Sequence, residues 1–217
     1  MITLITGLTG AGKTFLMSRL MLKRRKEGET IYCNLALEFP NDNEGVVRWH
    51  ALSELYSLEN GVIGIDEGQK LFNARLWRFL PLSFSDKIAS HRHQFIDIIT
   101  TTQDLGNIDV VFRRNIHELY NCASLFRYPK KEKYKPIFQI IRIVKKNRIF
   151  DDTAGIKFVE GGKKLYFLSK FWTKSLYNTY ANINLSHYIC QIKREKKKWL
   201  IILHSRQLAD LKQTGRS

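Results

Sequence analysis

Residues 7–14, with the sequence GLTGAGKT, place three glycines ahead of a lysine and a threonine in the pattern G-x-x-x-x-G-K-T. Glycines at this spacing let a loop curl so that its backbone N–H groups point at the oxygens of a bound phosphate. The lysine then reaches the β- and γ-phosphates of a nucleoside triphosphate, and the threonine hydroxyl can ligate Mg²⁺. We expect ATP with Mg²⁺ to bind at these residues and the next: Gly7, Gly10, Ala11, Gly12, Lys13, Thr14 and Phe15.

Two adjacent acids, Asp66 and Glu67, follow the apolar run GVIGI at residues 61–65. A carboxylate at the end of a buried strand can hold Mg²⁺ directly or through water, so Asp66 would complete a Mg²⁺ site with Thr14. An acid in the next position, Glu67, can polarise an attacking water, which favours a hydrolase over a small-molecule kinase. The alternative is an acid in a turn that only caps the following helix.

A third polar position, Gln103, follows the β-branched run FIDIITTT at residues 95–102. In P-loop ATPases with a strand inserted between the phosphate-binding strand and the acidic strand, a polar residue here senses the γ-phosphate and orients water. We expect the inserted strand to be TIYCN, residues 30–34, or a nearby segment. A glutamine that only caps the turn into residues 104–109 is the alternative.

Two histidines, His91 and His93, flank Arg92 just before that run. On a strand, two residues with this spacing share a face and could chelate a metal, but no further ligand stands at a zinc-like spacing. We therefore favour a polar structural element that places Arg92 near the nucleotide of a neighbouring subunit, as an arginine finger. Three other arginines compete for this role, and the sequence does not choose among them: Arg75, Arg113 and Arg114.

Short apolar runs alternate with helical stretches over the first part of the chain. This order predicts an α/β fold, a P-loop NTPase whose mostly parallel sheet is flanked by helices on both faces. The expected helix spans residues 13–26, and the expected strands are 1–6, 30–34, 61–66, 95–102 and 116–122. Two later segments, 135–150 and 163–168, are predicted to pair as antiparallel strands. We divide the chain into a P-loop ATPase core (1–128), a small basic β-rich extension packed on the core (129–186) and a basic helical tail (187–217).

The net charge of +16 is unevenly placed, with −1 over residues 1–110 and +17 over residues 111–217. This asymmetry favours a polyanionic partner, either single-stranded DNA or an anionic membrane surface, although a charge run can also be a solvated face. Three cysteines without paired spacing indicate a reducing compartment. No signal peptide and no apolar run of about 18 residues occurs, so we expect a cytoplasmic protein without a transmembrane segment.

Three segments together resemble the zonular occludens toxin (Zot) family, which includes the assembly ATPases of filamentous bacteriophages. They are IDEGQKLFNAR (65–75), SHRHQFIDIITTTQ (90–103) and IDVVFRRNIHELY (108–120). The stretch from the first histidine to the glutamine discriminates best. A later family motif resembling YDT is echoed by LYNTY (176–180), with Asn178 where the family often has aspartate. The resemblance covers about residues 1–180.

The resemblance implies a RecA-like core of the FtsK–HerA group that works as a ring, such as a hexamer. Such proteins drive extrusion of phage single-stranded DNA during virion assembly, with phage coat or membrane assembly proteins as partners. Family members usually carry a following membrane helix that this sequence does not show. Two interpretations stay open, a chain truncated before that helix and a shorter relative that docks on a separate membrane protein, and the second would place the protein peripherally at the inner face of the host membrane. Two alternatives stay open, namely a viral genome-packaging or other FtsK–HerA-type DNA translocase, and a non-motor nucleotide-binding module.

Overall fold

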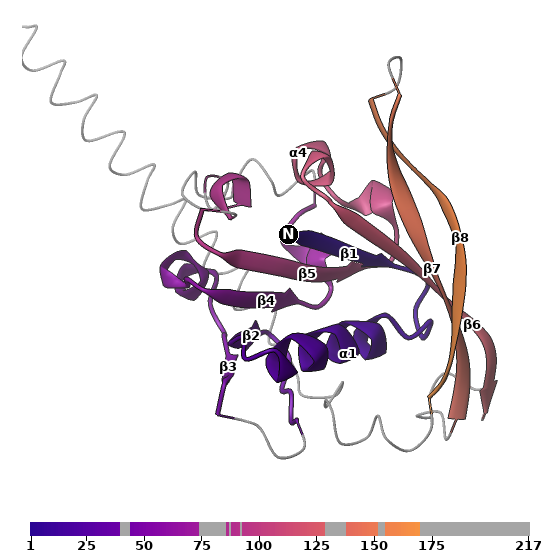
Figure 1. The fold of residues 1–217 in the computed structure, drawn as a ribbon, viewed down its shortest axis with the longest axis horizontal. Helices are drawn as coiled ribbons and strands as arrows, with labels where there is room; N and C mark the ends of the chain where they lie inside the picture. Colours follow the sequence, from indigo (N-terminus) through magenta and orange to yellow (C-terminus); the bar gives the residue numbers. More distant parts are fainter. Residues whose placement is uncertain are drawn as a thin grey trace, which may run out of the picture.

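The strands of this computed structural model, which describes residues 1–39, 44–73, 86, 88–91, 93–128, 138–151 and 155–169, form one mixed sheet (Figure 1). The strands are β1 (Ile2–Thr6), β2 (Ile31–Cys33), β3 (Val46–Arg48), β4 (Gly61–Ile65), β5 (Ile96–Thr102), β6 (Glu118–Tyr128), β7 (Phe138–Asp151) and β8 (Gly155–Ser169). Their order across the sheet is β3-β2-β4-β5-β1-β6-β7-β8. The first six strands pair in parallel, whereas β7 runs antiparallel to β6 and β8. The predicted α/β fold with a mostly parallel sheet is confirmed.

Helices lie on both faces of this sheet. The helix α1 (Lys13–Lys26) follows the loop after β1 and has the predicted bounds. Figure 1 shows α1 along one face and the short helix α4 (Val110–Arg114) on the other side. Three short 3₁₀ segments also occur: η1 (Leu52–Ser57), η2 (Gly68–Lys70) and η3 (Leu105–Asn107). Residues 86 and 88–90 are helical as well.

The core has two layers because side chains alternate across each strand. Ile5 of β1 faces α1, where it belongs to the same buried cluster as Met17 and Met21. Its neighbour Leu4 belongs to a second cluster on the other face, together with residues of α4 and of the segments around it. In that second layer the rings of Phe72 and Phe112 stack with their centroids 4.0 Å apart.

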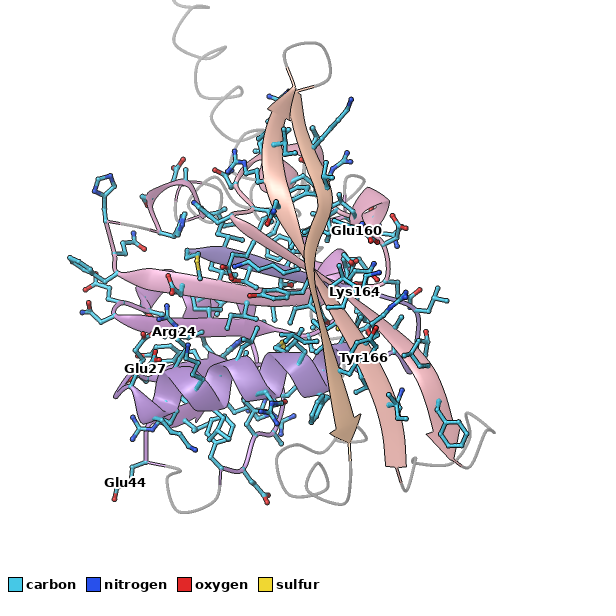
Figure 2. The ribbon with its side chains drawn as sticks, turned by 45° about the vertical axis from the view of Figure 1, so that its right-hand side comes forward. Arg24, Glu27, Glu44, Glu160, Lys164 and Tyr166 are labelled. Carbon is cyan, nitrogen blue, oxygen red and sulfur yellow. The ribbon has the colours of Figure 1, made fainter. Side chains whose placement is uncertain are left out.

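Ion pairs connect the last turn of α1 to the amino ends of the central strands. Arg24 forms ion pairs with Glu27 at 3.5 Å and with Glu29 at 3.1 Å, and a further pair with Asp97 of β5. Asp97 also pairs with the amino group of Met1. Figure 2 shows Arg24 and Glu27 side by side at this end of the helix. These pairs fix the edge of the sheet that lies away from the glycine loop.

The strand between β1 and β4 is β5, and the prediction that residues 30–34 fill this place was wrong. Residues Ile31–Cys33 form β2, which pairs with the outer side of β4, Ile31 lying opposite Val62. The order of the strands across the sheet depends on the crossover connections between them, and a short apolar run does not indicate which strand it will pair with. The strand β3 was not expected, since its two apolar residues, Val46 and Val47, are adjacent and show no alternating pattern, and neither is buried.

The predicted antiparallel pairing of β7 and β8 is confirmed, and it runs from Gln139 opposite Ser169 to Asp151 opposite Gly155. The predicted start of the second strand at residue 163 was wrong, because β8 already begins at Gly155. They continue the sheet of the core through β6, and Figure 1 shows the long twisted pair rising past the parallel strands. The three-part division of the chain stays a prediction. Residues 170–217, with Asn178 and the expected helical tail, lie outside the described residues. In the described part of the chain, no helix is long and apolar enough to cross a membrane.

Candidate nucleotide-binding site

The loop of residues 7–12 leaves the carboxyl end of β1 and leads directly into α1. Gly7, Gly10 and Gly12 have φ angles of 147°, 74° and 89°, values that only glycine adopts readily. The first helical N–H groups of α1 have no partners within the helix, so they can bind an anion at this end. The side chains of Ala11 and Phe15 are buried in the core, and these two residues can offer a ligand only their backbone.

Lys13 is the buried cation of this loop. Its side chain is only 6% exposed, and its Nζ donates to the Leu8 carbonyl oxygen at 3.1 Å. Burial lowers the pKa of Lys13, while the nearby charges of Glu67 and Asp66 act in the opposite direction. A buried ammonium is costly unless negative groups compensate it, and phosphate oxygens are groups of that kind.

Asp66 lies at the carboxyl end of β4, beside the first turn of α1. Thr14 Oγ1 donates to its two carboxylate oxygens at 3.2 and 3.4 Å, and Thr101 Oγ1 donates to Oδ1 at 2.6 Å. Burial, followed by the charge of Glu67, raises the pKa of Asp66 above its ordinary value. A half-buried carboxylate with a hydroxyl beside it is an oxygen donor set that suits Mg²⁺, and the cation would offset the negative charge of Asp66.

Glu67 follows in a left-handed backbone conformation, with φ 59° and ψ 46°. A non-glycine residue in this region is strained by about 1–3 kcal/mol, and such strain tends to occur where function requires a fixed geometry. Two contacts hold the residue: its N–H donates to Thr101 Oγ1 at 2.9 Å, and Gln69 donates to its carboxylate. The half-buried carboxylate therefore has a defined place next to Asp66.

Gln103 directly follows β5, and its carbonyl oxygen accepts from the N–H of Gly7 at 3.2 Å. Because β5 separates β1 from β4, Gln103 lies at the end of the inserted strand itself, between the glycine loop and the acidic pair. Its side chain is exposed and lines a cavity of about 310 Å³. Other residues of the lining include Lys146 and Phe158 from the β7–β8 pair.

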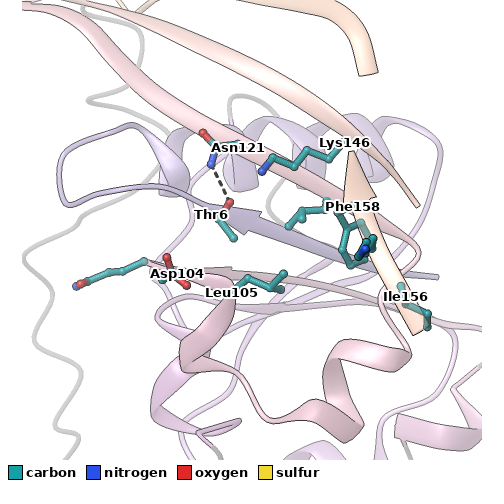
Figure 3. Close-up of a pocket in the computed structure, with 10 residues that line it drawn as sticks. Thr6, Asp104, Leu105, Asn121, Lys146, Ile156 and Phe158 are labelled. Carbon is teal, nitrogen blue, oxygen red and sulfur yellow. Dashed lines mark hydrogen bonds between the residues drawn. The ribbon is translucent and has the colours of Figure 1, made fainter. Parts of the chain in front are cut away.

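The cavity also reaches the end of β1, where Asn121 of β6 donates to the hydroxyl of Thr6 at 3.3 Å (Figure 3). Its polar lining combines two lysines and two amides with one acid: Lys146, Lys157, Gln103, Asn121 and Asp104. The glycine loop and this cavity therefore share one edge of the sheet.

Comparison with known proteins places this fold and site in a family. The profile described as zonular occludens toxin (Zot) matches residues 37–157, which is more than half of the chain. The chain belongs to the Zot family. The match contains Asp66, Glu67 and Gln103, whereas it begins after the glycine loop, so the interpretation of that loop depends on its own geometry.

One solved structure shows the same fold, and a second has a weaker similarity. The N-terminal domain of zonular occludens toxin from Neisseria meningitidis is 20% identical, with a TM-score of 0.52, over 82% of this chain and 98% of that one. The genome packaging NTPase B204 from Sulfolobus turreted icosahedral virus 2, in complex with ATP-gammaS, is 12% identical, with a TM-score of 0.47, over 73% of this chain and 96% of that one. No curated protein matches the sequence.

The two histidines of the Zot-like HRH segment lie in different environments. His91 is 3% exposed, and its Nδ1 lies 2.7 Å from the Ile88 carbonyl oxygen, whereas His93 is exposed. Both occupy a turn before β5 rather than a strand, so the shared face needed for chelation is not formed. The ring of His91 packs edge-on against His117, with centroids 5.6 Å apart. No cluster of three or more possible metal ligands occurs among the described residues.

The arginine that would act in trans is not assigned by this structure. Arg92 and Arg75 lie outside the described residues. Arg113 and Arg114 are in the last turn of α4, where Arg113 is half-buried and Arg114 is exposed. The role of Arg92 therefore stays a prediction.

Three residues that the sequence analysis missed support the Zot site. Asn34, just after β2, accepts from Asp66 N–H at 2.8 Å and donates to the Asp66 carbonyl oxygen at 3.1 Å. Thr101 bridges the two acids, and Gln139 of β7 reaches the glycine loop. A polar residue at the end of each apolar run was the available signal for Asn34, as it was for Gln103.

Proposed function

We propose that this member of the Zot family is an ATP-hydrolysing motor for the assembly of filamentous phage particles and the extrusion of their DNA. The observation that carries the proposal is the convergence of four side chains at one edge of the sheet: Lys13, Thr14, Asp66 and Glu67. This cation, hydroxyl and acid pair meets the chemical needs of nucleoside triphosphate hydrolysis.

Each residue has a separate part in the proposed reaction. The glycine loop and Lys13 bind the phosphates and balance their charge, and Thr14 with Asp66 would hold Mg²⁺. When bound, Mg²⁺ neutralises charge on the β- and γ-phosphate oxygens. Glu67 accepts a proton from the attacking water, and Gln103 orients that water. The bond between the β-phosphate and the γ-phosphate then breaks, giving ADP and inorganic phosphate.

The assay that tests the proposal measures phosphate release with and without single-stranded DNA. Lys13→Ala should nearly abolish nucleotide binding, because the buried cation opposite the phosphates is lost. Glu67→Gln should retain binding and lower turnover by about 10²–10⁴, the usual contribution of a positioned base. Lys23→Ala and Glu59→Gln are matched controls, since both side chains are exposed. Turnover of Glu67→Gln at the wild-type rate would remove the catalytic assignment.

A motor of this kind would require a ring of subunits and a polyanionic partner. The charge of +17 over residues 111–217 supports a contact with single-stranded DNA or with an anionic membrane surface. If Arg92 acts in trans, activity per subunit should rise with protein concentration, and Arg92→Ala protein should poison wild-type activity when the two are mixed. Full activity of a strictly monomeric form would contradict the ring.

A further inference from the structure

The glycine loop is supported by strands that lie beyond the predicted P-loop motifs. A Cβ atom on Gly7 would lie 2.3 Å from the carbonyl oxygen of Cys122 in β6. A Cβ atom on Gly12 would lie 2.4 Å from Cδ1 of Ile141 in β7, whose side chain is fully buried. Two glycines of the motif therefore serve close packing against β6 and β7 in addition to their backbone angles.

The third glycine is held by a side chain. Gln139 of β7 is 5% exposed, and its Nε2 donates to the Gly10 carbonyl oxygen at 2.5 Å. The N–H of the same peptide unit, which belongs to Ala11, donates to the Leu8 carbonyl oxygen at 3.1 Å. Both polar ends of this peptide unit are thus fixed, and its orientation in the loop is defined.

The position of Gln139 is otherwise apolar. It precedes Ile141 and Ile143 at a spacing of two along β7, and all three side chains are buried. An amide at such a position is costly unless it is hydrogen-bonded, whereas a third apolar side chain would pack without that cost. The hydrogen bond to Gly10 offsets the cost of burying the amide and links β7 to the glycine loop.

We propose that Gln139 is a positioning residue for phosphate binding, acting through the Gly10–Ala11 peptide. The proposal rests on the proposed function, because the ligand it concerns is the triphosphate of ATP. Rotation of this peptide unit would turn a carbonyl oxygen toward the phosphates, and oxygen dipoles there oppose an anion. Gln139 holds that oxygen on the β7 side and keeps the loop in the form that accepts phosphate.

The test compares full-length wild type with Gln139→Met, which retains length and packing but cannot donate. The Kd for ATP and the KM should rise by about threefold to tenfold, the equivalent of one lost hydrogen bond, while kcat at saturating ATP stays within about twofold. Gln139→Glu should bind more weakly still, because a carboxylate would face the Gly10 oxygen. The matched control is Gln94→Met, whose amide donates to Ser90 Oγ at 3.4 Å near the amino end of β5. An unchanged Kd in Gln139→Met would overturn the proposal.

Hydrogen exchange separates this inference from the proposed function. Without any nucleotide, amides of residues 7–12 should exchange faster in Gln139→Met than in wild type, and equal exchange would overturn the positioning role. If wild type binds no ATP, the proposed function fails. The exchange rates of residues 7–12 in Gln139→Met and wild type then still decide whether Gln139 positions the loop. If Gln139→Met does not fold, wild type alone decides: Mg²⁺–ATP should protect the amides of residues 138–143, and no protection there would refute the link.

Discussion

The hydroxyl of Thr101 contacts both Asp66 and Glu67. Thr101→Val should therefore lower the free energy of unfolding more than the same substitution at the neighbouring Thr102. Valine has nearly the shape of threonine, so the substitution removes the hydroxyl without leaving a cavity. The hydroxyl donates to Asp66 at 2.6 Å and accepts from the N–H of Glu67 at 2.9 Å. Both contacts are lost together.

The size of the effect follows from these two contacts. A hydrogen bond to a charged group contributes about 1.5–3 kcal/mol, and a buried N–H that loses its acceptor costs about 1–3 kcal/mol. The added methyl group recovers about 0.8 kcal/mol of apolar burial. The net loss should be about 2–5 kcal/mol, which lowers the melting temperature by about 4–20 °C for a protein of this size.

The assay is thermal unfolding of wild type, Thr101→Val and the control Thr102→Val. Thr102 is equally buried, but its hydroxyl donates to a neutral group, the Asp104 carbonyl oxygen, at 3.1 Å. Its substitution should cost only about 0.5–1.5 kcal/mol. The hydroxyl of Thr101 lowers the pKa of Asp66, so the excess loss in Thr101→Val should shrink as the pH falls and Asp66 becomes protonated. Equal losses in the two variants would refute the reasoning.

Three further outcomes are expected. At neutral pH, without Mg²⁺ or nucleotide, Asp66→Asn should have a higher melting temperature than wild type, because burial raises the pKa of Asp66 and so disfavours its ionised form in the folded protein. This gain in melting temperature should vanish toward about pH 4, and a constant gain across a pH series of melting curves would contradict it. Asn34→Leu, which removes both bonds to the Asp66 backbone, should lower kcat and cost about 1–3 kcal/mol in denaturant unfolding; unaltered kcat would argue against a role in placing Asp66. Binding to labelled single-stranded DNA should weaken with salt, with a log–log slope of about −0.7 per phosphate contacted, and absence of binding at low salt would leave the basic charge as a solvated surface.

Local signals in the sequence were enough to predict the phosphate loop and the acid pair. The spacing of the glycines with Lys13 and Thr14 is a property of consecutive residues, and the bounds of α1 follow from the glycine before it and the basic residues in its last turn. Asp66 was found because it ends an apolar run. The place of Gln103 at the edge of the sheet was also predictable, although its role in catalysis stays a prediction.

Long-range pairing was not predictable from these signals. The place of β5 between β1 and β4 depends on crossovers that join segments far apart in the chain. Gln139 was missed because its partner, Gly10, lies 129 residues away. A glutamine in phase with Ile141 and Ile143 was the local anomaly that could have drawn attention to it. Buried polar side chains become interpretable only when their partners are known.

The link between β7 and the glycine loop has a consequence for synthesis of the chain. The loop is made first, but Gln139 and Ile141, which support it, are added more than 120 residues later. At about 5–20 residues per second, this interval on the ribosome lasts several seconds or longer. A nascent chain that ends before β7 carries the phosphate-binding motif without the strand that shapes it. The capacity to bind ATP should therefore arise late and together with the completed sheet, so that unfinished chains do not consume nucleotide.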